Sequence, residues 1–575
     1  MPTPASRSIV RARSLVRRCA LAGAAVAAAS AGSVALAAPQ ESPAALRAAR
    51  AATVAAASAR PFEVARHRIE ARVEPAERSL DLLDEIEVVA RVDGLAELRL
   101  YTSVVTVDDV TCDRPIEWSS APSPNADVLT VTFGAPLAAG ERVTLLVHAF
   151  AADYFLGTDQ QLIAEIAVLG QVRPRSSWSS HVLWYPFDEG HDAAMEITFD
   201  VPAGYVAVTG GRRVLHEEAD GRARFRYVEE TRHARLLPFG FAVAQYATAA
   251  AKSPAGLDLE VFAWPGEEAR IAQRVQLLQK GAAQFERALG PLPWSAVRFC
   301  HVTPETKETG VSLPGQILVS DFYFPDLAGV DASDGDLERP DVLGLLVVAD
   351  ELSHQWNIYA AGFPNELGEG LSTWTNAFFV EALHGAAAYR KVLAGCKRGW
   401  IGAPMRGAAE RAIADPAVYA TARYRSIVFC KTPLVLHLLR EQLGDERFFA
   451  GLAAAFARRE RAVDGFERFA AGFSAGAGVD LAPFFEQWFF RAGWPKVALA
   501  MHPIPGGAAV TTRQLQEGAD WDFELPLEFR GAGDAVHRTR IRINRREQVF
   551  DVAVPFVPQS LQGDPDDACP IEIAR

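Results

Sequence analysis

The spacing of apolar residues changes twice along this chain of 575 residues. Between about residue 62 and residue 250, segments such as 67–73, 85–92 and 128–133 alternate apolar and polar residues, which is typical of strands with one buried face. Helical spacing replaces this alternation in residues 267–289, 341–360, 371–395, 432–457 and 481–491, with short strand-like runs at 296–300 and 316–320. Alternation returns after Pro495, in residues 521–529 and 541–544. Because single hydrophobic cores stop growing at roughly 250–300 residues, we expect a multidomain α+β protein. It should have an N-terminal β-saddle or sandwich, a mostly helical middle domain and a small C-terminal β-sandwich.

The N-terminus has the pattern of a signal peptide over residues 1–37. A positive region carries five arginines, an Ala-rich apolar stretch follows at 20–37, and Ala35-Leu36-Ala37 is a small-x-small cleavage site. The alternative is an uncleaved membrane anchor, but alanine contributes little insertion energy. We therefore predict export to the periplasm or the extracellular space. The remaining chain divides into an Ala-rich linker at 38–60, a β domain at 61–252, the middle domain at 253–494 and the C-terminal sandwich at 495–575.

Composition restricts the partners and the chemistry. Apolar residues make up 49% and charged residues 22% of the chain, and the net charge is −13. Nucleic-acid binding usually leaves a basic footprint, and none is visible beyond the extreme N-terminus. No other segment has the roughly 20 apolar residues of a membrane span. The chain that follows the signal keeps five cysteines with long, irregular spacings and no Cys-x-x-Cys pair, so we expect buried thiols and at most one or two disulfides: Cys112, Cys300, Cys396, Cys430 and Cys569.

The segment 347–356, Val-Val-Ala-Asp-Glu-Leu-Ser-His-Gln-Trp, concentrates chemical groups on one predicted helix. Positions four apart share a helix face, so Asp350 and His354 should project side by side, with Glu351 next to them. A second predicted helix opens at Glu369 and could bring that carboxylate to the same place. Such residues also occur on solvated helix faces. Here the apolar run before the motif indicates a buried face, and buried charges are costly unless they are paired or bind a metal.

These residues resemble the aminopeptidase N family of zinc peptidases. That family reads His-Glu-Leu-x-His-Gln-Trp and then Glu-Gly-Phe-Ala, where this chain has Asp350-Glu-Leu-Ser-His-Gln-Trp and Glu369-Gly-Leu-Ser. Other stretches agree in order, so the resemblance covers about residues 62–575: 184–188, 201–205, 289–294, 434–445, 484–489 and 493–495. It implies a β-saddle, a thermolysin-like catalytic domain and a β-sandwich.

The resemblance also implies roles for individual residues. Asp350, His354 and Glu369 take the three ligand positions of one Zn²⁺ ion, and Glu351 takes the position of the general base. Carboxylate oxygen can bind zinc, although Asp is shorter than His and two carboxylates make the metal less Lewis-acidic. The connection from His354 to Glu369 is shorter than the family's eighteen intervening residues, so its loop must be trimmed; Glu366 is an alternative ligand.

Two further positions depart from the family pattern. The substrate-binding strand, usually Gly-Ala-Met-Glu-Asn, corresponds here to a run from Gly310 that places Ser312 where the amine-anchoring Glu is expected. Glu305 or Glu308 could substitute for that anchor. The family's catalytic tyrosine aligns with Phe429, which cannot donate a hydrogen bond to an oxyanion. Tyr424 is a candidate replacement, although a packed aromatic side chain is an equally good interpretation.

Two hypotheses of function follow from the resemblance. One is a zinc metallopeptidase of aminopeptidase N type with an altered site, acting on a peptide substrate. The other is a catalytically inactive relative that keeps the architecture and binds peptides or proteins. The retained base and two ligands favour the first hypothesis; the combined changes at the first ligand, the amine anchor and the tyrosine favour the second. The oligomeric state has no sequence signal.

Overall fold

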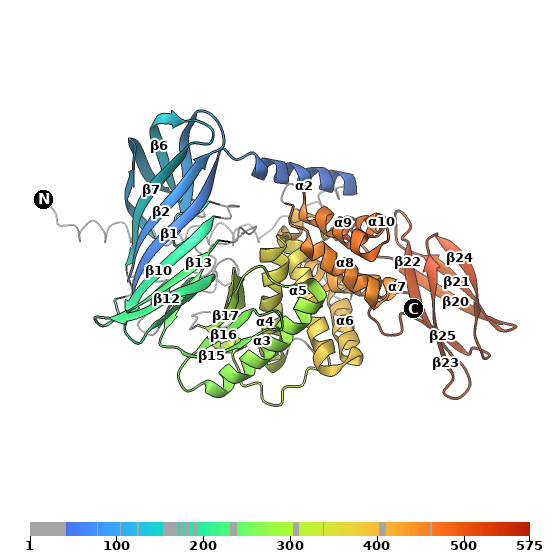
Figure 1. Ribbon diagram of the computed structural model, residues 1–575. Coiled ribbons are helices and arrows are strands. Elements are labelled where there is room, and N and C mark those ends of the chain that lie inside the picture. Colours follow the sequence, from blue (N-terminus) through green and yellow to red (C-terminus); the bar gives the residue numbers. More distant parts are fainter. Residues whose placement is uncertain are drawn as a thin grey trace, which may run out of the picture.

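The computed structural model describes residues 42–77, 79–103, 105–123, 126–152, 171–172, 176–179, 183–188, 193–230, 239–302, 310–336, 339–401, 410–460 and 463–574. N-terminal sheets, a helical middle and C-terminal sheets follow one another along the molecule (Figure 1), which confirms the multidomain α+β fold. The expected signal peptide, Glu305 and Glu308 lie outside the described residues. Among the described residues, no helix is both long and apolar enough to cross a membrane.

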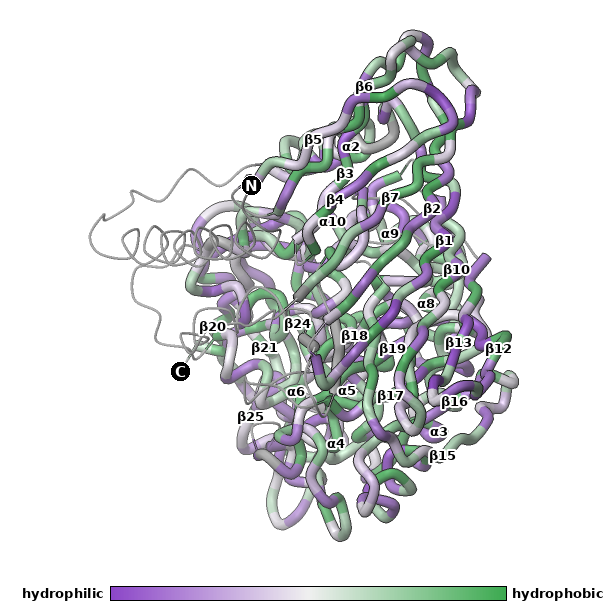
Figure 2. The backbone as a smooth tube through the Cα atoms, turned by 90° about the vertical axis from the view of Figure 1, so that its left-hand side faces the viewer, coloured by the Kyte–Doolittle hydropathy of each residue, from purple (hydrophilic) through white to green (hydrophobic). Residues whose placement is uncertain are grey.

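Long antiparallel strands with one buried face build the N-terminal part. Residues in β1 and β2 alternate between buried and more exposed positions, and Figure 2 shows hydrophobic and hydrophilic residues interleaved along them. The largest sheet has the order β12-β13-β10-β1-β2-β7-β4, with β1 and β10 parallel. Its strands are β1 (Phe62–Glu74), β2 (Ser79–Ala90), β4 (Thr106–Cys112), β7 (Arg142–Ala152), β10 (Ala194–Pro202), β12 (Arg212–Ala219) and β13 (Arg222–Glu229).

Within its described residues, this part of the chain also forms two smaller sheets. One has the order β3-β6-β5, made of β3 (Leu95–Thr102), β5 (Ile116–Pro122) and β6 (Asp127–Leu137). The other has the order β11-β14-β9-β8, made of β8 (Gln171–Val172), β9 (Ser176–Ser179), β11 (Val206–Thr209) and β14 (Phe241–Ala244).

A five-stranded sheet leads into the helical part, and its edge strand borders the candidate site. The order is β15-β16-β17-β19-β18, with β18 antiparallel at one edge. The strands are β15 (Ala247–Lys252), β16 (Asp258–Ala263), β17 (Ala296–His301), β18 (Gly310–Leu313) and β19 (Gln316–Val319). Helix α3 (Glu268–Leu289) connects β16 to β17 and packs on β15 and β16.

The helices agree with the predicted periodicity but break at glycines. The run expected at 371–395 is two helices, because Gly385 has a φ of 84° at the junction, a left-handed value that suits glycine. The run at 432–457 is broken in the same way at Gly444, with a φ of 74°. The helices are α4 (Pro340–His354), α5 (Asn365–His384), α6 (Ala386–Trp400), α7 (Thr432–Leu443), α8 (Asp445–Ala457), α9 (Gly465–Ala477) and α10 (Ala482–Phe489).

Over the residues that the structure describes, four short irregular helices accompany them. Two are 3₁₀ turns, η2 (Asp321–Tyr323) and η4 (Pro416–Ala420), and two are π-helices, η3 (Gln355–Ala360) and η5 (Ser426–Lys431). The π-helices continue directly into or out of regular helices: η3 follows α4, and η5 precedes α7. Such π-helical segments are rare in proteins, and those that occur are often found at functional sites.

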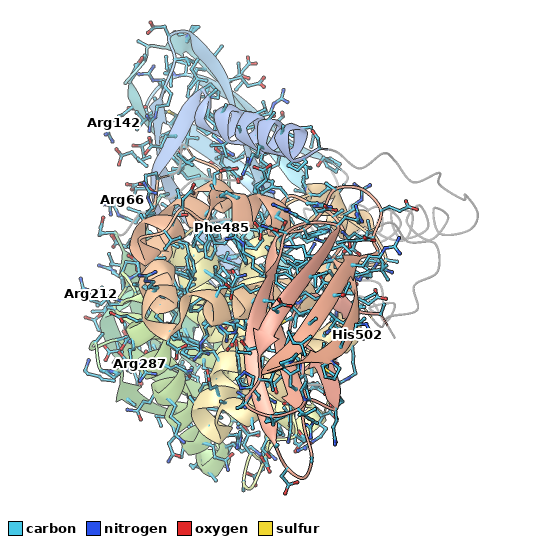
Figure 3. The ribbon with its side chains drawn as sticks, turned by 90° about the vertical axis from the view of Figure 1, so that its right-hand side faces the viewer. Arg66, Arg142, Arg212, Arg287, Phe485 and His502 are labelled. Atoms are coloured by element: carbon cyan, nitrogen blue, oxygen red, sulfur yellow. The ribbon has the colours of Figure 1, made fainter. Side chains whose placement is uncertain are left out.

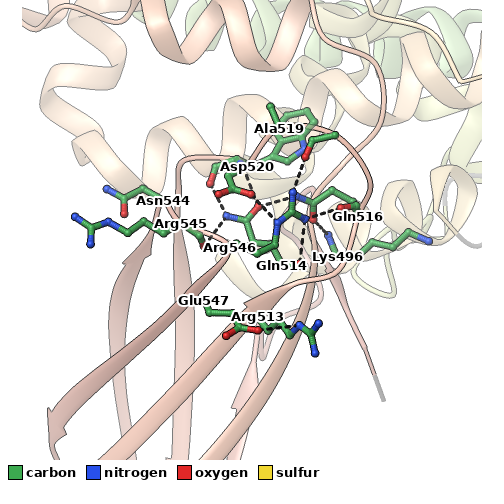
Figure 4. Close-up of polar contacts among 12 residues, drawn as sticks. Lys496, Arg513, Gln514, Gln516, Ala519, Asp520, Asn544, Arg545, Arg546 and Glu547 are labelled. Carbon is green, nitrogen blue, oxygen red and sulfur yellow. Dashed lines mark hydrogen bonds and ion pairs between the residues drawn. The ribbon is translucent and has the colours of Figure 1, made fainter.

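The C-terminal strands pack on the helical part. Their sheets have the orders β24-β21-β20-β26 and β23-β22-β25. Phe485 of α10 lies in the helical layer behind the sheet that carries His502 (Figure 3). Arg546 binds the carbonyl oxygens of Gln514 and Gln516 and so secures the connection after β21 (Figure 4). The strands are β20 (Lys496–Ile504), β21 (Gly507–Gln514), β22 (Phe523–Arg530), β23 (Val536–Ile543), β24 (Glu547–Ala553), β25 (Ser560–Gly563) and β26 (Glu572–Ile573).

The segment expected to be a linker contains a helix instead. Helix α2 (Pro43–Ser58) is rich in alanine, the best helix former, and Figure 1 shows it beside α9. Leu46 is buried in the core of the helical part. Arg50 donates to Asp464 at 2.8 Å and to the Ala414 carbonyl at 3.2 Å. These contacts hold α2 on the helical part, so most of the segment 38–60 is a docked helix.

Candidate metal centre

Helix α4 places the motif as its sequence predicts. The apolar residues Val348 and Leu352 are fully buried, so the face of α4 that carries these two residues packs into the core. Asp350 and His354 are one turn apart and point the same way: the Nε2 atom of His354 lies 3.5 Å from Oδ2 of Asp350. Glu351 is buried beside them.

Helix α5 brings Glu369 to the same imidazole. Its Oε2 atom lies 3.7 Å from Nε2 of His354. The short spacing does not separate these residues, because η3 continues α4 and a brief turn leads directly into α5. Glu369 therefore lies on the second turn of α5 and does not open the helix.

Glycines on both sides of Glu369 allow α5 to approach its neighbours. A Cβ atom on Gly368 would lie 2.7 Å from Cγ1 of Ile358 in η3. One on Gly370 would lie 2.7 Å from Cγ2 of Thr432, and closer still to its Cβ and Oγ1 atoms. Both distances are shorter than side chains tolerate, so the position of Glu369 depends on these two glycines.

The side chains on α4 form a group that could hold a metal ion. Asp350, Glu351 and His354 can each offer one ligand atom, and these atoms all lie within 4.8 Å of one another. In the part of the chain that the structure describes, this is the one such group of three or more residues. Glu369 is added to it through its contact with His354. Carboxylate oxygen and imidazole nitrogen are ordinary ligands of divalent cations.

Two asparagines orient the ligands, and neither was predicted from the sequence. Asn376 on α5 donates to Oδ1 of Asp350 at 2.8 Å. The Oδ1 atom of Asn357 lies 3.2 Å from Nδ1 of His354, so an Nδ1–H donor leaves Nε2 directed at the carboxylates. Their positions, three residues after His354 and seven after Glu369, are spacings that return to the same helix face. Such outer partners commonly fix the orientation of metal ligands.

Strand β18 passes directly against Glu351. A Cβ atom on Gly310 would lie 3.1 Å from Oε1 of Glu351, and the backbone N–H of Ser312 donates to the same carboxylate. The Ser312 hydroxyl accepts a hydrogen bond from Gln355 at 2.6 Å, and Gly315 N–H donates to Gln355 at 2.9 Å. Gln355, the first residue of η3, thus anchors the edge strand to this π-helix, a role that was not predicted from the sequence.

The candidate tyrosine lies near the group of carboxylates. Tyr424 packs edge-on against Phe429, with ring centroids 5.7 Å apart, and its hydroxyl forms a hydrogen bond with that of Tyr419. Burial, followed by the charge of Glu369, raises the pKa of Tyr424, which keeps the hydroxyl protonated and able to donate. Phe429 itself lies in η5.

Glu366, the alternative ligand, has a different partner. Its carboxylate lies 3.7 Å from Arg50 of α2. Burial raises the pKa of Glu366, and the charge of Arg50 opposes this rise. The contact with a helix far away in the sequence explains why an acidic residue is buried here without a metal.

Burial and crowding of like charges control the electrostatics. Burial is the largest cause that raises the pKa of Glu351, to about 8, with smaller contributions from Asp350 and Glu369. Burial opposes protonation of His354, but the neighbouring carboxylates, Glu369 first, outweigh it and raise its pKa to about 10. Burial also raises the pKa of Glu369. Three carboxylates around one imidazole therefore attract positive charge, which a proton or a metal cation can supply.

Comparisons with known proteins find two curated relatives that are named Aminopeptidase N. The chain is 24% identical over 342 residues to Aminopeptidase N of Lactococcus lactis subsp. lactis, which covers 55% of this chain and 38% of that protein. It is 28% identical over 124 residues to Aminopeptidase N of strain IL1403, covering 20% and 14%. The chain thus spans less than half the length of these curated relatives. No protein-family model matches it.

A solved structure has the same fold. Aminopeptidase A of Legionella pneumophila, in complex with aspartic acid, matches with a TM-score of 0.68 and 14% sequence identity. The match covers 90% of this chain and 60% of that protein.

Proposed function

Because this chain is related to the aminopeptidase family, we propose that it is a zinc-dependent metallopeptidase of aminopeptidase N type with an altered metal site. One observation carries the proposal. Two helices bring Asp350 and Glu369 to within 3.5 Å and 3.7 Å of the same His354 nitrogen, beside the buried carboxylate of Glu351. Charged side chains that are simply solvated at the surface have no need to meet at one imidazole from two different helices.

The ligand set fits zinc. One imidazole nitrogen and carboxylate oxygens are ligand types that Zn²⁺ accepts, and the hydrogen bond at Nδ1 leaves Nε2 of His354 directed inward. Asn376 holds Asp350 from behind. When bound, zinc would supply Lewis acidity, which polarises a peptide carbonyl and acidifies a water molecule.

Glu351 is the proposed general base and proton carrier. Its carboxylate lies next to the ligand group, and the Ser312 N–H holds it in place. A general base works best with a pKa near the working pH, and burial moves Glu351 toward that range. A cation nearby favours its ionised form, so it can accept a proton from water and later deliver it to the leaving amine.

The remaining residues bind the peptide and stabilise the developing charge. Strand β18 is an edge strand, and an extended peptide could pair with its backbone at Gly310 and Ser312. The Tyr424 hydroxyl is the proposed oxyanion donor, since Phe429 has none. Losing one such donor typically costs about 10²–10³ in rate. The N-terminal pattern at residues 1–37 supports export, so we place the activity in the periplasm or outside the cell.

The alternative is an inactive relative that binds peptides or proteins. The observation that favours it is the pairing within the site: protonated His354 can satisfy Asp350 and Glu369 without any metal. Phe429 at the position of the family's tyrosine agrees with this alternative.

Zinc content and one substitution distinguish the two functions. We expect purified protein to retain nearly one zinc per chain after dialysis, and Asp350→His to raise zinc affinity at least about tenfold, since imidazole replaces a shorter carboxylate ligand. Asp341→His, on the exposed start of the same helix, is the matched control and should leave affinity unchanged. Aminoacyl-arylamides and internally quenched peptides then separate exo- from endopeptidase activity. If the purified protein contains no metal, and neither the wild-type protein nor Asp350→His takes up added zinc, the inactive relative is favoured.

A further inference from the structure

Two cysteines from different elements of the helical part lie in contact. Cys396 is on α6 and Cys430 is on η5, the π-helix that also carries Phe429. The Cys396 thiol donates a hydrogen bond to the Cys430 sulfur. They are therefore neighbours in space although 34 positions separate them in the sequence.

Packing around Gly399 supports this placement independently. A Cβ atom on Gly399 would lie 3.2 Å from Sγ of Cys430. Gly399 is three residues after Cys396, on the same face of α6. The Cys430 sulfur thus lies over the α6 backbone where no side chain intervenes, and α6 packs on η5 along this contact.

We propose that Cys396 and Cys430 form a disulfide that joins α6 to η5. The proposal rests on this contact and not on the proposed peptidase function. Cys112, Cys300 and Cys569 lie on β4, on β17 and after β25, so the pair is set apart from the other cysteines of the described chain.

Thiol–disulfide exchange with a small disulfide, such as oxidised glutathione, supplies the oxidant. The Cys430 thiolate attacks one glutathione sulfur, so a mixed disulfide forms, the glutathione S–S bond breaks and one glutathione thiolate leaves. Cys396 then attacks the Cys430 sulfur, and the second glutathione thiolate leaves. The two cysteine protons pass to the two leaving thiolates: the protein loses two electrons and one glutathione disulfide becomes two thiols.

The order of attack follows from exposure. Cys396 is buried, whereas Cys430 is partly exposed. The hydrogen bond with Cys430, together with burial, raises the pKa of Cys396, which makes Cys396 the slower thiol to ionise. Cys430 therefore meets the oxidant first, and Cys396 resolves the mixed disulfide.

The cross-link would close a loop that includes Tyr419, Tyr424 and Phe429. Closing a loop of this length stabilises mainly by restricting the unfolded chain, in the entropic account of disulfides. It would also hold η5 in place against α5, the helix that carries Glu369.

Peptide mapping of the folded full-length protein tests the proposal. Trypsin releases residues 392–397 and 426–431 as separate peptides with one cysteine each. After incubation with oxidised glutathione and alkylation of the remaining thiols, we expect these two peptides to be joined until a reductant is added. We also expect the Tm of the helical part to rise by about 5–10 °C on oxidation.

Two variants provide the comparison. Cys396→Ala should abolish both the joined peptide and the rise in Tm, whereas Cys112→Ala should keep both. Glutathione that stays on Cys430 of the wild-type protein, or a bond from either peptide to a different cysteine, would overturn the proposal. The wild-type map decides the question even if a variant fails to fold.

Discussion

Replacing Gly370 by alanine tests whether close helix packing positions the third candidate ligand. The new methyl group would lie 2.7 Å from Cγ2 of the buried Thr432, whereas carbon atoms pack at roughly 3.5–4.0 Å. Helix α5 must therefore move away from Thr432 by about 1 Å. That displacement exceeds the roughly 0.5 Å within which a functional site must be held, and Glu369 is the adjacent residue.

The expected cost can be worked from two opposing effects. Overpacking a filled core costs about 1–3 kcal/mol. Alanine is a better helix former than glycine by about 1 kcal/mol, so the net loss of folding stability should be about 0–2 kcal/mol. Because Glu369 moves with the helix, zinc affinity should fall about tenfold or more.

Gly395→Ala is the matched control on α6. Its new Cβ atom would meet nothing closer than 3.8 Å, so it should gain up to about 1 kcal/mol from helix propensity and leave zinc affinity unchanged. Chemical denaturation measures stability, and competition with a chelator measures affinity. If Gly370→Ala is as stable as Gly395→Ala and binds zinc equally well, the close approach of α5 does not position Glu369.

Two further substitutions test the docking of α2 and a buried histidine. Arg50→Ala should lose about 3 kcal/mol in chemical denaturation, because it leaves buried carboxylates without their partner. Arg47→Ala, whose partners are more exposed, should lose under about 1 kcal/mol; equal losses would contradict the docking of α2 through Arg50. Burial, followed by nearby arginines, lowers the pKa of His437 to about 3. As the pH falls below about 6.5, His437 therefore binds a proton in the unfolded chain but stays neutral in the folded chain. Folding stability should therefore fall between pH 6.5 and pH 4.5 by roughly 2–3 kcal/mol from this residue, and denaturation of His437→Gln at both pH values should show a correspondingly smaller fall.

Much of the architecture could be predicted because it depends on local regularities. A strand alternates with period two and a helix repeats every 3.6 residues, so the order of sheets and helices is readable from apolar spacing. The same rule predicted that Asp350 and His354 share a face, four positions apart on one helix. Glycine's access to left-handed φ values explains the breaks at Gly385 and Gly444, which apolar spacing alone did not reveal.

The tertiary structure decided which distant groups meet. The short connection to Glu369 works because η3 prolongs α4 and two glycines let α5 approach closely. Arg50 of α2 forms an ion pair with Glu366, and Cys396 contacts Cys430, although no sequence spacing indicates either contact. Backbone periodicity is set by neighbours in the chain, whereas these contacts depend on how whole helices pack. That packing depends on all the side chains of the core together.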